Sequence, residues 1–247
     1  VGISSQERAL RKGTARSADK FDLLVAAPGS KTEMLFNVVF LESSAVELLK
    51  PKQWAPLLSE KHAVFAAPFA FGDSYHGFPV IGTTPGFVSY LVDGNIEGRM
   101  FKSLDEAMVG TGVPLSVGST FTPAHGQGFS ADAEGHEGKD FRVVGQLAYT
   151  GTPWDRAIIL PVESVWNVHA MPNGHDPEGT SPDRIGPPFD PDFLTGVPAV
   201  ILKPDSVAAA YGLRNKYRTE ETMAFFPAEV LVQLYQYLGD VTVIIRA

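Results

Sequence analysis

The chain has 247 residues, of which 44% are hydrophobic and 19% are charged, and this composition is typical of a folded globular protein. Its net charge of −8 argues against a general nucleic-acid-binding protein, because binding to phosphates needs a surplus of lysine and arginine. The absence of cysteine excludes disulfides, thiolate zinc sites and cysteine nucleophiles.

The two ends of the chain look cut. The sequence starts at Val1 without a methionine, and it stops within an apolar run, Val241–Ala247. Two interpretations stay open at this point, a segment of a longer protein and a mature secreted protein. No stretch of the sequence approaches the roughly 18 to 20 continuous apolar residues that a transmembrane helix requires.

The first third of the chain predicts short elements. Residues 4–20 are rich in helix formers and basic side chains, which favours an exposed basic helix. Residues 21–27 form a short apolar segment that ends at Pro28-Gly29, as expected for a buried strand followed by a turn. Ser44 and Glu47 have the spacing of a helix capping box, and Pro51 is placed to begin a second short helix.

The middle of the chain predicts strands joined by turns. Residues 63–71 and 78–82 are apolar and flank the turn-rich segment 72–77, which predicts a β-hairpin. From residue 83 to 142 the glycine content rises and the apolar runs shorten, so we expect a β-rich insertion. Its polar segment 124–140 predicts a loop.

Residues 141–147 and 157–160 predict two further strands, followed by a short helix over 161–168. Residues 171–198 contain seven prolines, a density that precludes a regular helix or strand and predicts an extended surface loop.

The last fifty residues alternate between the two kinds of element. Strands are predicted at 199–202 and 223–226, a helix capped by Asp205 runs to Tyr217, and a second helix covers 227–238 and ends at Gly239. This order predicts a parallel strand pair with a right-handed crossover.

Ser74 lies in a Gly-Asp-Ser sequence of the kind that carries the nucleophile of some serine hydrolases. The only Asp-x-x-His sequence in the chain, Asp73–His76, overlaps this block, so no separate base is available nearby in the sequence. We therefore interpret residues 72–77 as a hairpin turn and keep a secreted hydrolase as an alternative function.

His125 and His136 are the candidate metal ligands. They lie with Asp132, Glu134 and Glu137 in a glycine-rich segment, and histidine with carboxylate is a donor set that suits zinc. Ordering a flexible loop around an ion costs conformational entropy, so a solvated loop without a cofactor is the alternative. A second group is assigned to the surface of the proline-rich loop: His169, His175 and Asp176.

Residues 150–156, Thr-Gly-Thr-Pro-Trp-Asp-Arg, form a compact turn with an acid beside a guanidinium. The turn is interpreted either as a partner contact or as a structural turn that Asp155 or Thr152 holds through hydrogen bonds to the backbone.

The order of several segments resembles the extracytoplasmic domain of MacB/FtsX/LolC-type ABC transporter permeases. The segments that carry the resemblance are AVFAAPFAFGDSYHGFPVIGTT (63–84), FRVVGQL (141–147), TGTPWDRA (150–157), LPVESVWNVH (160–169) and MAFFPAE (223–229). The resemblance implies an α/β (α+β) fold, with a porter-like mixed core formed by both chain ends at 1–84 and 166–247. It also implies that residues 85–165 form an inserted, β-rich, sabre-like subdomain.

For function, the resemblance implies the periplasmic domain of an inner-membrane permease, placed between two membrane helices, that is not itself an enzyme. It implies three partners: a cytoplasmic ABC ATPase subunit, a second permease copy and a periplasmic partner protein. ATP hydrolysis in the cytoplasm would then drive mechanical movement outside the membrane. The alternatives are a secreted hydrolase that uses Ser74 and a periplasmic metal-binding module that uses His125 and His136.

Overall fold

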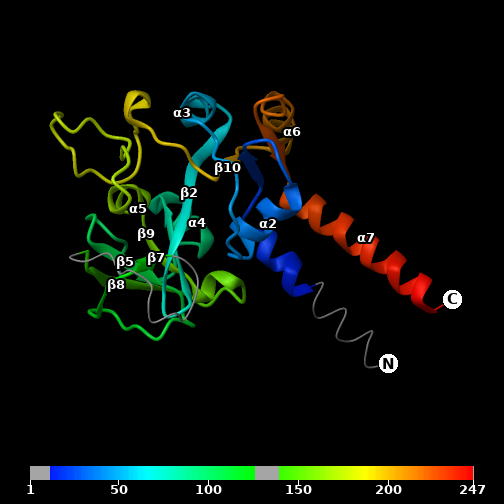
Figure 1. Cartoon of the computed structure of the whole chain (residues 1–247), viewed down its shortest axis with the longest axis horizontal. Coiled ribbons are helices and arrows are strands. Elements are labelled where there is room, and N and C mark those ends of the chain that lie inside the picture. Colours follow the sequence, from blue (N-terminus) through cyan, green and yellow to red (C-terminus); the bar gives the residue numbers. More distant parts are fainter. Residues whose placement is uncertain (1–11, 126–138, 247) are drawn as a thin grey trace.

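The computed structural model describes residues 12–125 and 139–246, which form a mixed α+β structure (Figure 1). The predicted fold class is therefore confirmed. The strands of the sheet follow the order β11-β1-β10-β2-β3-β9-β5-β8-β4, with β6 paired to β8 and β7 paired to β2. The strands are β1 (Leu23–Ala26), β2 (Ala63–Tyr75), β3 (Phe78–Thr83), β4 (Ile96–Gly98), β5 (Glu106–Val109), β6 (Thr120–Phe121), β7 (Ala124–His125), β8 (Phe141–Leu147), β9 (Ile158–Pro161), β10 (Ala199–Pro204) and β11 (Met223–Phe225).

The helices lie mostly at the two ends of the sequence. Residues 12–18 are helical, in agreement with the predicted basic helix, whose earlier residues lie outside the described part. The other helices are α2 (Lys31–Val39), α3 (Pro51–Trp54), η1 (Ala55–Ser59), α4 (Pro85–Leu91), η2 (Pro153–Arg156), α5 (Val162–Val168), η3 (Pro191–Phe193), α6 (Val207–Lys216) and α7 (Pro227–Arg246).

The strand β2 joins the two halves of the sheet. Its first part pairs with β10 as far as Phe69, and its second part pairs with β3 from Ala70 onward, so the predicted hairpin is confirmed. The turn between β2 and β3 is tighter than expected. It consists of His76 and Gly77, which both have positive φ, as a two-residue hairpin turn requires.

The predicted core ranges 1–84 and 166–247 supply β1, β2, β3, β10 and β11, and residues 85–165 supply β4 to β9. The predicted division of the chain into two subdomains stays a prediction. The segment 85–165 also contains the helix α4, which the prediction of a β-rich insertion did not include. Thr84 begins this helix by accepting a hydrogen bond from the backbone N–H of Phe87.

Three predictions about the chain ends are wrong. Strands β10 and β11 are not neighbours, because β1 lies between them and pairs antiparallel with both. Ser206, rather than Asp205, caps α6 by accepting from Ala209 N. The helix α7 continues through Gly239 to Arg246.

The capping box predicted at Ser44 and Glu47 does not begin a helix. The helix in this part of the chain is α2, which lies before it. Ser30 caps α2 by accepting from Glu33 N, and Met34, Leu35 and Val38 are buried on one face. The Asn37 side chain donates to Ser44 Oγ and accepts from Ser44 N. These bonds hold the segment after α2 against that helix as irregular chain, and no helix begins at Ser44.

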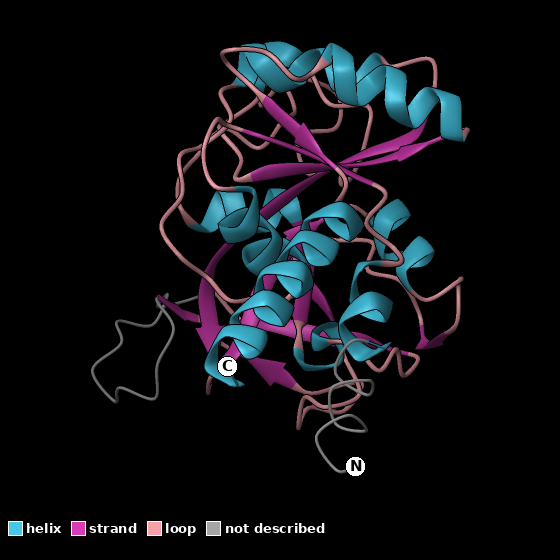
Figure 2. Cartoon of the chain, turned by 90° about the vertical axis from the view of Figure 1, so that its right-hand side faces the viewer, coloured by secondary structure: helices cyan, strands magenta, loops and turns pink. Residues whose placement is uncertain are grey.

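The core lies on both faces of the sheet. In β1, Leu24 and Ala26 belong to one buried cluster, and Leu23 and Val25 belong to the other. The helices in Figure 2 accordingly lie on both sides of these strands. A strand that is apolar on both faces is expected where helices cover the sheet on each side.

Residues 171–198 contain a single short helix, η3, and otherwise follow an irregular path, as their prolines predict. The segment is anchored by aromatic packing. Phe189 lies 6.3 Å from Trp54 and 5.9 Å from Trp166 between ring centroids. Trp54 Nε1 donates to Thr195 O at 2.9 Å. Phe189 and Thr195 therefore attach the second part of the segment to α3 and α5, whereas residues 176–181 are exposed, as predicted for a surface loop.

Candidate functional site

The two ends of the described chain lie side by side. The helix 12–18 runs next to α7 (Figure 1), and the hydroxyl groups of Thr14 and Tyr235 form a hydrogen bond between residues that are 221 positions apart. The helix α7 also contacts α2. We call the helix 12–18 and α7 together the terminal stem.

The terminal stem is packed into the core where it meets the sheet. Phe21, directly after the first stem helix, is 2% exposed. Its ring centroid lies 5.5 Å from that of Phe87 in α4 and 5.9 Å from that of Trp154 in η2. Both of those residues belong to the segment 85–165. The N-terminal half of the stem is therefore joined to that segment by a continuous aromatic contact.

A polar cluster surrounds Tyr90 at the same junction. The phenol of Tyr90 donates to Asp22 Oδ2 at 3.0 Å, and Lys203 Nζ lies 3.1 Å from the same oxygen. Lys20 Nζ lies 2.5 Å from Asp93 Oδ1. Both lysine ammonium groups lie 4.8 Å from the Tyr90 ring centroid, so the ring also binds two cations through its face.

Burial, together with Asp22, raises the pKa of Tyr90 above its ordinary value. The phenol therefore stays protonated at neutral pH and keeps donating to Asp22. The cluster joins three elements that are distant in sequence: the segment after the stem helix, α4 and β10.

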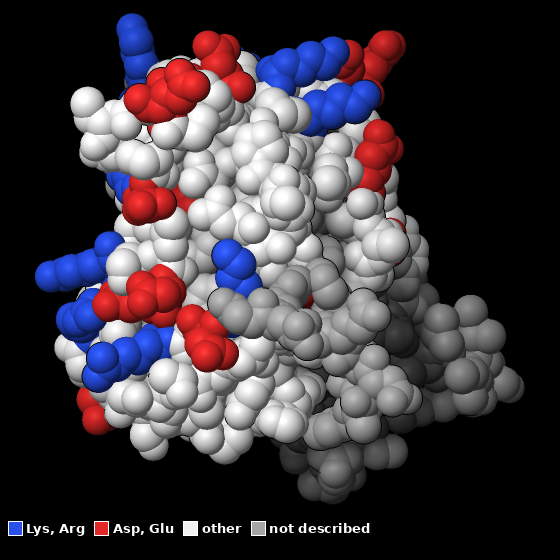
Figure 3. Space-filling model, turned by 60° about the vertical axis from the view of Figure 1, so that its left-hand side comes forward, with Lys and Arg blue, Asp and Glu red and all other residues white. Residues whose placement is uncertain are grey.

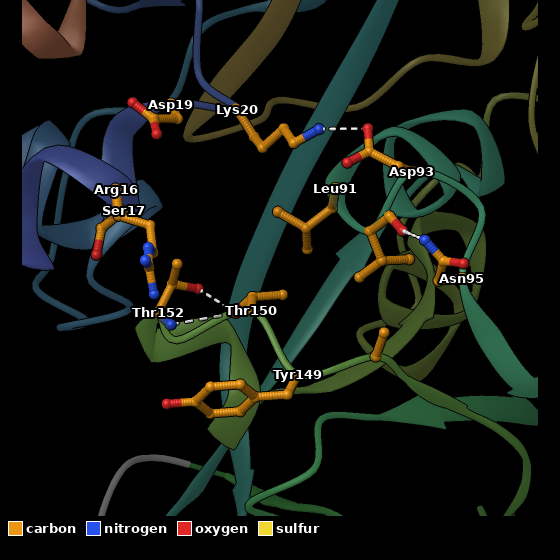
Figure 4. A pocket seen from close by; sticks show the side chains of 12 residues that line it. Arg16, Ser17, Asp19, Lys20, Leu91, Asp93, Asn95, Tyr149, Thr150 and Thr152 are labelled. Carbon is orange, nitrogen blue, oxygen red and sulfur yellow. Dashed lines mark hydrogen bonds and ion pairs between the residues drawn. The ribbon is translucent and has the colours of Figure 1, made fainter.

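A cleft of about 330 Å³ opens beside this cluster (Figure 4). The end of the stem helix forms one wall with Arg16 and Ser17, and the 148–152 segment forms the opposite wall. The ion pair of Lys20 with Asp93 crosses one side of the cleft. The exposed side chain of Tyr149 lies at the opposite side. The cleft therefore lies between the terminal stem and the segment 85–165, which also meet where the Arg16 side chain reaches Gly151.

Of the two interpretations of the turn 150–156, the structure supports the second, in which Asp155 and Thr152 hold the turn through hydrogen bonds to the backbone. The Asp155 carboxylate accepts from Thr150 N, Thr150 Oγ1 and Gly151 N, each at 2.8 Å. Thr152 Oγ1 accepts from Trp154 N at 3.3 Å. These bonds place Trp154 in the core, against Phe21. No contact with another protein is needed to explain the sequence of this turn.

Ser74 lies within β2, whereas the sequence placed it in a turn. It pairs with Pro79 and Ala124 on the two neighbouring strands, and it is 3% exposed. A nucleophilic serine must be accessible to its substrate. Burial inside a paired strand therefore gives no support to the hydrolase alternative.

The structure describes only one of the two predicted metal ligands. His125 is the last residue of β7, where it pairs with Asp73 of β2. His136 lies outside the described residues, as do Asp132, Glu134 and Glu137. Among the side chains that the structure describes, no three histidine or carboxylate groups are grouped to hold a metal ion.

The structure brings together two polar pairs that the sequence did not predict. His169 Nε2 lies 3.4 Å from Asp73 Oδ2. His175 Nε2 lies 3.5 Å from Glu163 Oε1, and Glu163 also accepts from Gly186 N at 2.6 Å. His175 is 7% exposed, so its assignment to the surface is wrong: it is buried against Phe189, on which its ring stacks.

Searches with the sequence found no matching family model and no matching curated protein. The structure is similar to the periplasmic region of MacB from Actinobacillus actinomycetemcomitans, with a TM-score of 0.52 and 11% sequence identity. That match covers 90% of this chain and 95% of the other. A second match, with a TM-score of 0.43 and 12% identity, covers 82% of this chain and 98% of the extracellular domain of the noncanonic ABC-type transporter YknZ from Gram-positive bacteria.

The chain therefore has the fold of a transporter periplasmic domain. In particular, it has the fold of the periplasmic region of MacB, as the order of its sequence segments implied. Within residues 12–125 and 139–246, no helix combines the length and the apolar character that are needed to cross a bilayer.

Proposed function

We propose that this chain is the extracytoplasmic domain of an ABC transporter permease and that it carries mechanical movement, without catalysing a reaction. The observation that carries the proposal is the terminal stem, in which two helices from opposite ends of the sequence lie side by side. This is the geometry required of a domain inserted between two neighbouring membrane helices. The MacB-like fold supports the same placement.

The junction of the stem with the sheet suits the transmission of movement. Phe21 packs on Trp154 and Phe87, and Lys20 pairs with Asp93, so a displacement of the first stem helix acts directly on the segment 85–165. Close-packed interiors have low compressibility and transmit strain. The cleft beside this contact leaves space on one side into which the stem can tilt.

The partners proposed for this domain follow from its place in a permease. They are a cytoplasmic ABC ATPase subunit, reached through the membrane part, a second permease copy and a periplasmic partner protein, with the permease in the inner membrane. Nucleic acid is not among them, because the chain carries a net charge of −8. The face in Figure 3 also shows acidic and basic side chains interspersed, without a large basic patch.

The experiment measures distances within the intact gene product that contains this chain, reconstituted with its ATPase in lipid. The 247-residue chain has no cysteine, so once any cysteines elsewhere in the gene product are replaced, spin labels can be attached at single introduced cysteines. One pair is Tyr237→Cys on α7 with Val117→Cys in the segment 85–165, since both side chains are exposed. We expect the distance distribution of this pair to change between the nucleotide-free and ATP-bound states.

The matched control is Val64→Cys with Val207→Cys, two exposed positions on the part of the fold built from the chain ends. Its distance distribution should be the same in both states. If the distance distribution of the first pair were also the same in the nucleotide-free and ATP-bound states, the proposed coupling would be contradicted. A gene product without a membrane helix on each side of this chain would contradict the placement in a permease.

A further inference from the structure

We propose that Glu163 and His175 form a pH-sensitive latch on the 175–185 loop, which is the outer part of the proline-rich segment. The latch is closed while the imidazole of His175 is protonated, and it loosens when the imidazole loses its charge. The proposal is independent of the transport function, because it concerns only contacts within the 247-residue chain.

The carboxylate of Glu163 holds both ends of the loop. Glu163 lies near the start of α5, and its side chain is 0% exposed. Its Oε1 atom accepts from Gly186 N at 2.6 Å, and the same atom lies 3.5 Å from His175 Nε2. One buried carboxylate therefore contacts the residues at which the loop leaves the fold and returns to it.

The backbone turns sharply at the same two places. Gly174 and Gly186 have φ values of 83° and 71°, a conformation that favours glycine. The N–H of Gly174 donates to Phe193 O at 2.9 Å, and its carbonyl accepts from Asp190 N at 2.8 Å. Between the two glycines, residues 176–181 are exposed. The loop is therefore fastened at its base, while much of its length lies in solvent.

The base of the loop contains two buried polar atoms that have no hydrogen bond among the described residues, His175 Nε2 and Glu163 Oε2. Burying a charge is costly unless an opposite charge lies beside it. When His175 is protonated, its positive charge faces the carboxylate. The Phe189 ring, stacked on the imidazole with 5.5 Å between centroids, presents a face that attracts a cation. Loss of the proton leaves the carboxylate as an uncompensated buried charge, which is strongly destabilising.

In the part of the chain that the structure describes, neither Glu163 nor His175 has a second ion pair. The helix α5 contacts β2, β3 and β9, of which β3 and β9 carry no ionisable side chain. On β2, Asp73 pairs with His169 at the other end of α5. The other ionisable side chains on the surrounding elements are Tyr75 on β2, Lys52 on α3, Asp105 before β5, and Asp176, Glu178, Asp183, Arg184, Asp190 and Asp192 on the proline-rich segment. The charge at the base of the loop is therefore decided by Glu163 and His175.

The protonated imidazole sets the sign of the pH dependence. Histidine ordinarily loses its proton between about pH 5 and 8. Because the carboxylate stabilises the protonated form in the folded chain, the fastening is complete at the acid end of this range and is lost as the pH rises. Glutamate ordinarily becomes neutral only near about pH 4.3, so the carboxylate keeps its charge at about pH 6.

The test measures cleavage by trypsin after Arg184, an exposed residue within the loop, in the 247-residue chain. Cleavage follows the population of chains in which the loop has opened. At each pH, the rate is divided by the rate on a peptide of residues 180–188, which removes the pH dependence of the protease. We expect this corrected rate to rise at least about tenfold between about pH 6 and pH 9, because loss of one charge of a buried pair has a large effect.

Two variants remove the charge pair. Glu163→Gln keeps an oxygen that can accept from Gly186 N but has no charge, and His175→Gln cannot be protonated. In both, the corrected rate should be high and should change little with pH. His62→Gln is the matched control, because His62 pairs with Asp205 at 3.1 Å but has a side chain that is 71% exposed. This variant should keep the pH dependence of the unchanged chain.

The proposal is overturned if the corrected rate of the unchanged chain does not change with pH, or if it falls as the pH rises. It is equally overturned if His175→Gln folds and keeps the full pH dependence. If circular dichroism shows that neither variant folds, the nuclear magnetic resonance signal of the His175 imidazole in the unchanged chain decides. Titration of that signal together with the rise in cleavage supports the latch, and titration in a different pH range overturns it.

Discussion

The hydroxyl groups of Thr14 and Tyr235 form a hydrogen bond that joins the first described helix to the last. The two residues are separated by 221 positions, so nothing local in the sequence brings them together. Around this bond, Val230 and Leu231 on α7 are buried in the same cluster as Ala18 and Phe21. The two halves of the terminal stem are thus part of the folded domain itself.

The bond between Thr14 and Tyr235 predicts a coupling between two variants. Thr14→Val and Tyr235→Phe each remove one hydroxyl, and each should lower the free energy of unfolding by about 0.5–1.5 kcal/mol. The double variant should lose less than the sum, because both changes remove the same bond. Urea unfolding of the four proteins measures this. Tyr237→Phe, at an exposed position of α7, is the control and should change little; additive losses would contradict the contact.

Gly110 is required by the close approach of the 150–156 turn. A Cβ at this position would lie 2.3 Å from Asp155 O and 2.5 Å from Trp154 O, so backbone would have to shift. We expect Gly110→Ala to lower the free energy of unfolding by about 1–3 kcal/mol. Gly86→Ala is the control, since it lies in α4 with open space around it, and it should be neutral or stabilising by up to about 1 kcal/mol. Thermal unfolding compares the two, and equal effects would show that the turn has room at Gly110.

Glu106 makes stability depend on pH. The Arg99 guanidinium, which donates to both of its carboxylate oxygens, lowers the pKa of Glu106 to about 2, and Lys102 N assists. An unfolded glutamate has a pKa of about 4.3. Because the folded pKa is the lower one, the stabilisation is complete above about pH 4.3 and is lost as the pH falls toward 2.

The Arg99→Gln variant should therefore lose less stability than the unchanged chain when the pH falls. Urea midpoints at pH 7 and pH 3 should differ less for this variant than for the unchanged chain. Lys52→Gln serves as the comparison, because its 3.8 Å ion pair with Glu221 is exposed and should contribute little. The assignment to Arg99 is wrong if both variants show the pH dependence of the unchanged protein.

Phe189 anchors the proline-rich segment. Its ring is 7% exposed and contacts Trp54, Trp166 and His175. Phe189→Ala should lower the free energy of unfolding by about 3–5 kcal/mol and should make residues 171–198 susceptible to limited proteolysis under native conditions. Tyr149→Ala, which removes an exposed ring, should leave the proteolysis pattern unchanged. Cleavage at equal rates in both variants would mean that Phe189 does not hold the segment.

The burial of Ser74 predicts that the folded chain does not react with a fluorophosphonate probe of serine hydrolases. Mass spectrometry after incubation with the probe measures the modification. A stoichiometric adduct on Ser74 would revive the hydrolase alternative.

Elements with strong local signals could be predicted from the sequence. The apolar strand after residue 20, the β2–β3 hairpin and the helix begun by Pro51 carry turn or proline signals at their ends, and all three are present. The helix α2 was missed although Ser30 and Glu33 mark its start. Its buried residues fall within the nearly continuous apolar run 34–41, in which the helical period is hard to see.

Features that depend on the tertiary structure could not be predicted. Strand β1 separates β10 from β11, so the pairing inferred from their order in the sequence was wrong. The pairs of Asp73 with His169 and of Glu163 with His175 have no sequence spacing that marks them, because each joins a helix to a different part of the fold. The resemblance implied a domain placed between two membrane helices, but the contact between its two ends through Thr14 and Tyr235 could not be predicted from it.

The length of β2 has a geometric consequence. Its thirteen residues, at about 3.3 Å each, span roughly 43 Å, and one continuous strand is hydrogen-bonded to β10 near its start and to β7 near its end. A rotation of about 10° around one end of a rod of this length moves the other end by roughly 7 Å. If β2 moved as one unit, a small rotation at one of its ends would therefore displace its other end by more than the width of a water molecule.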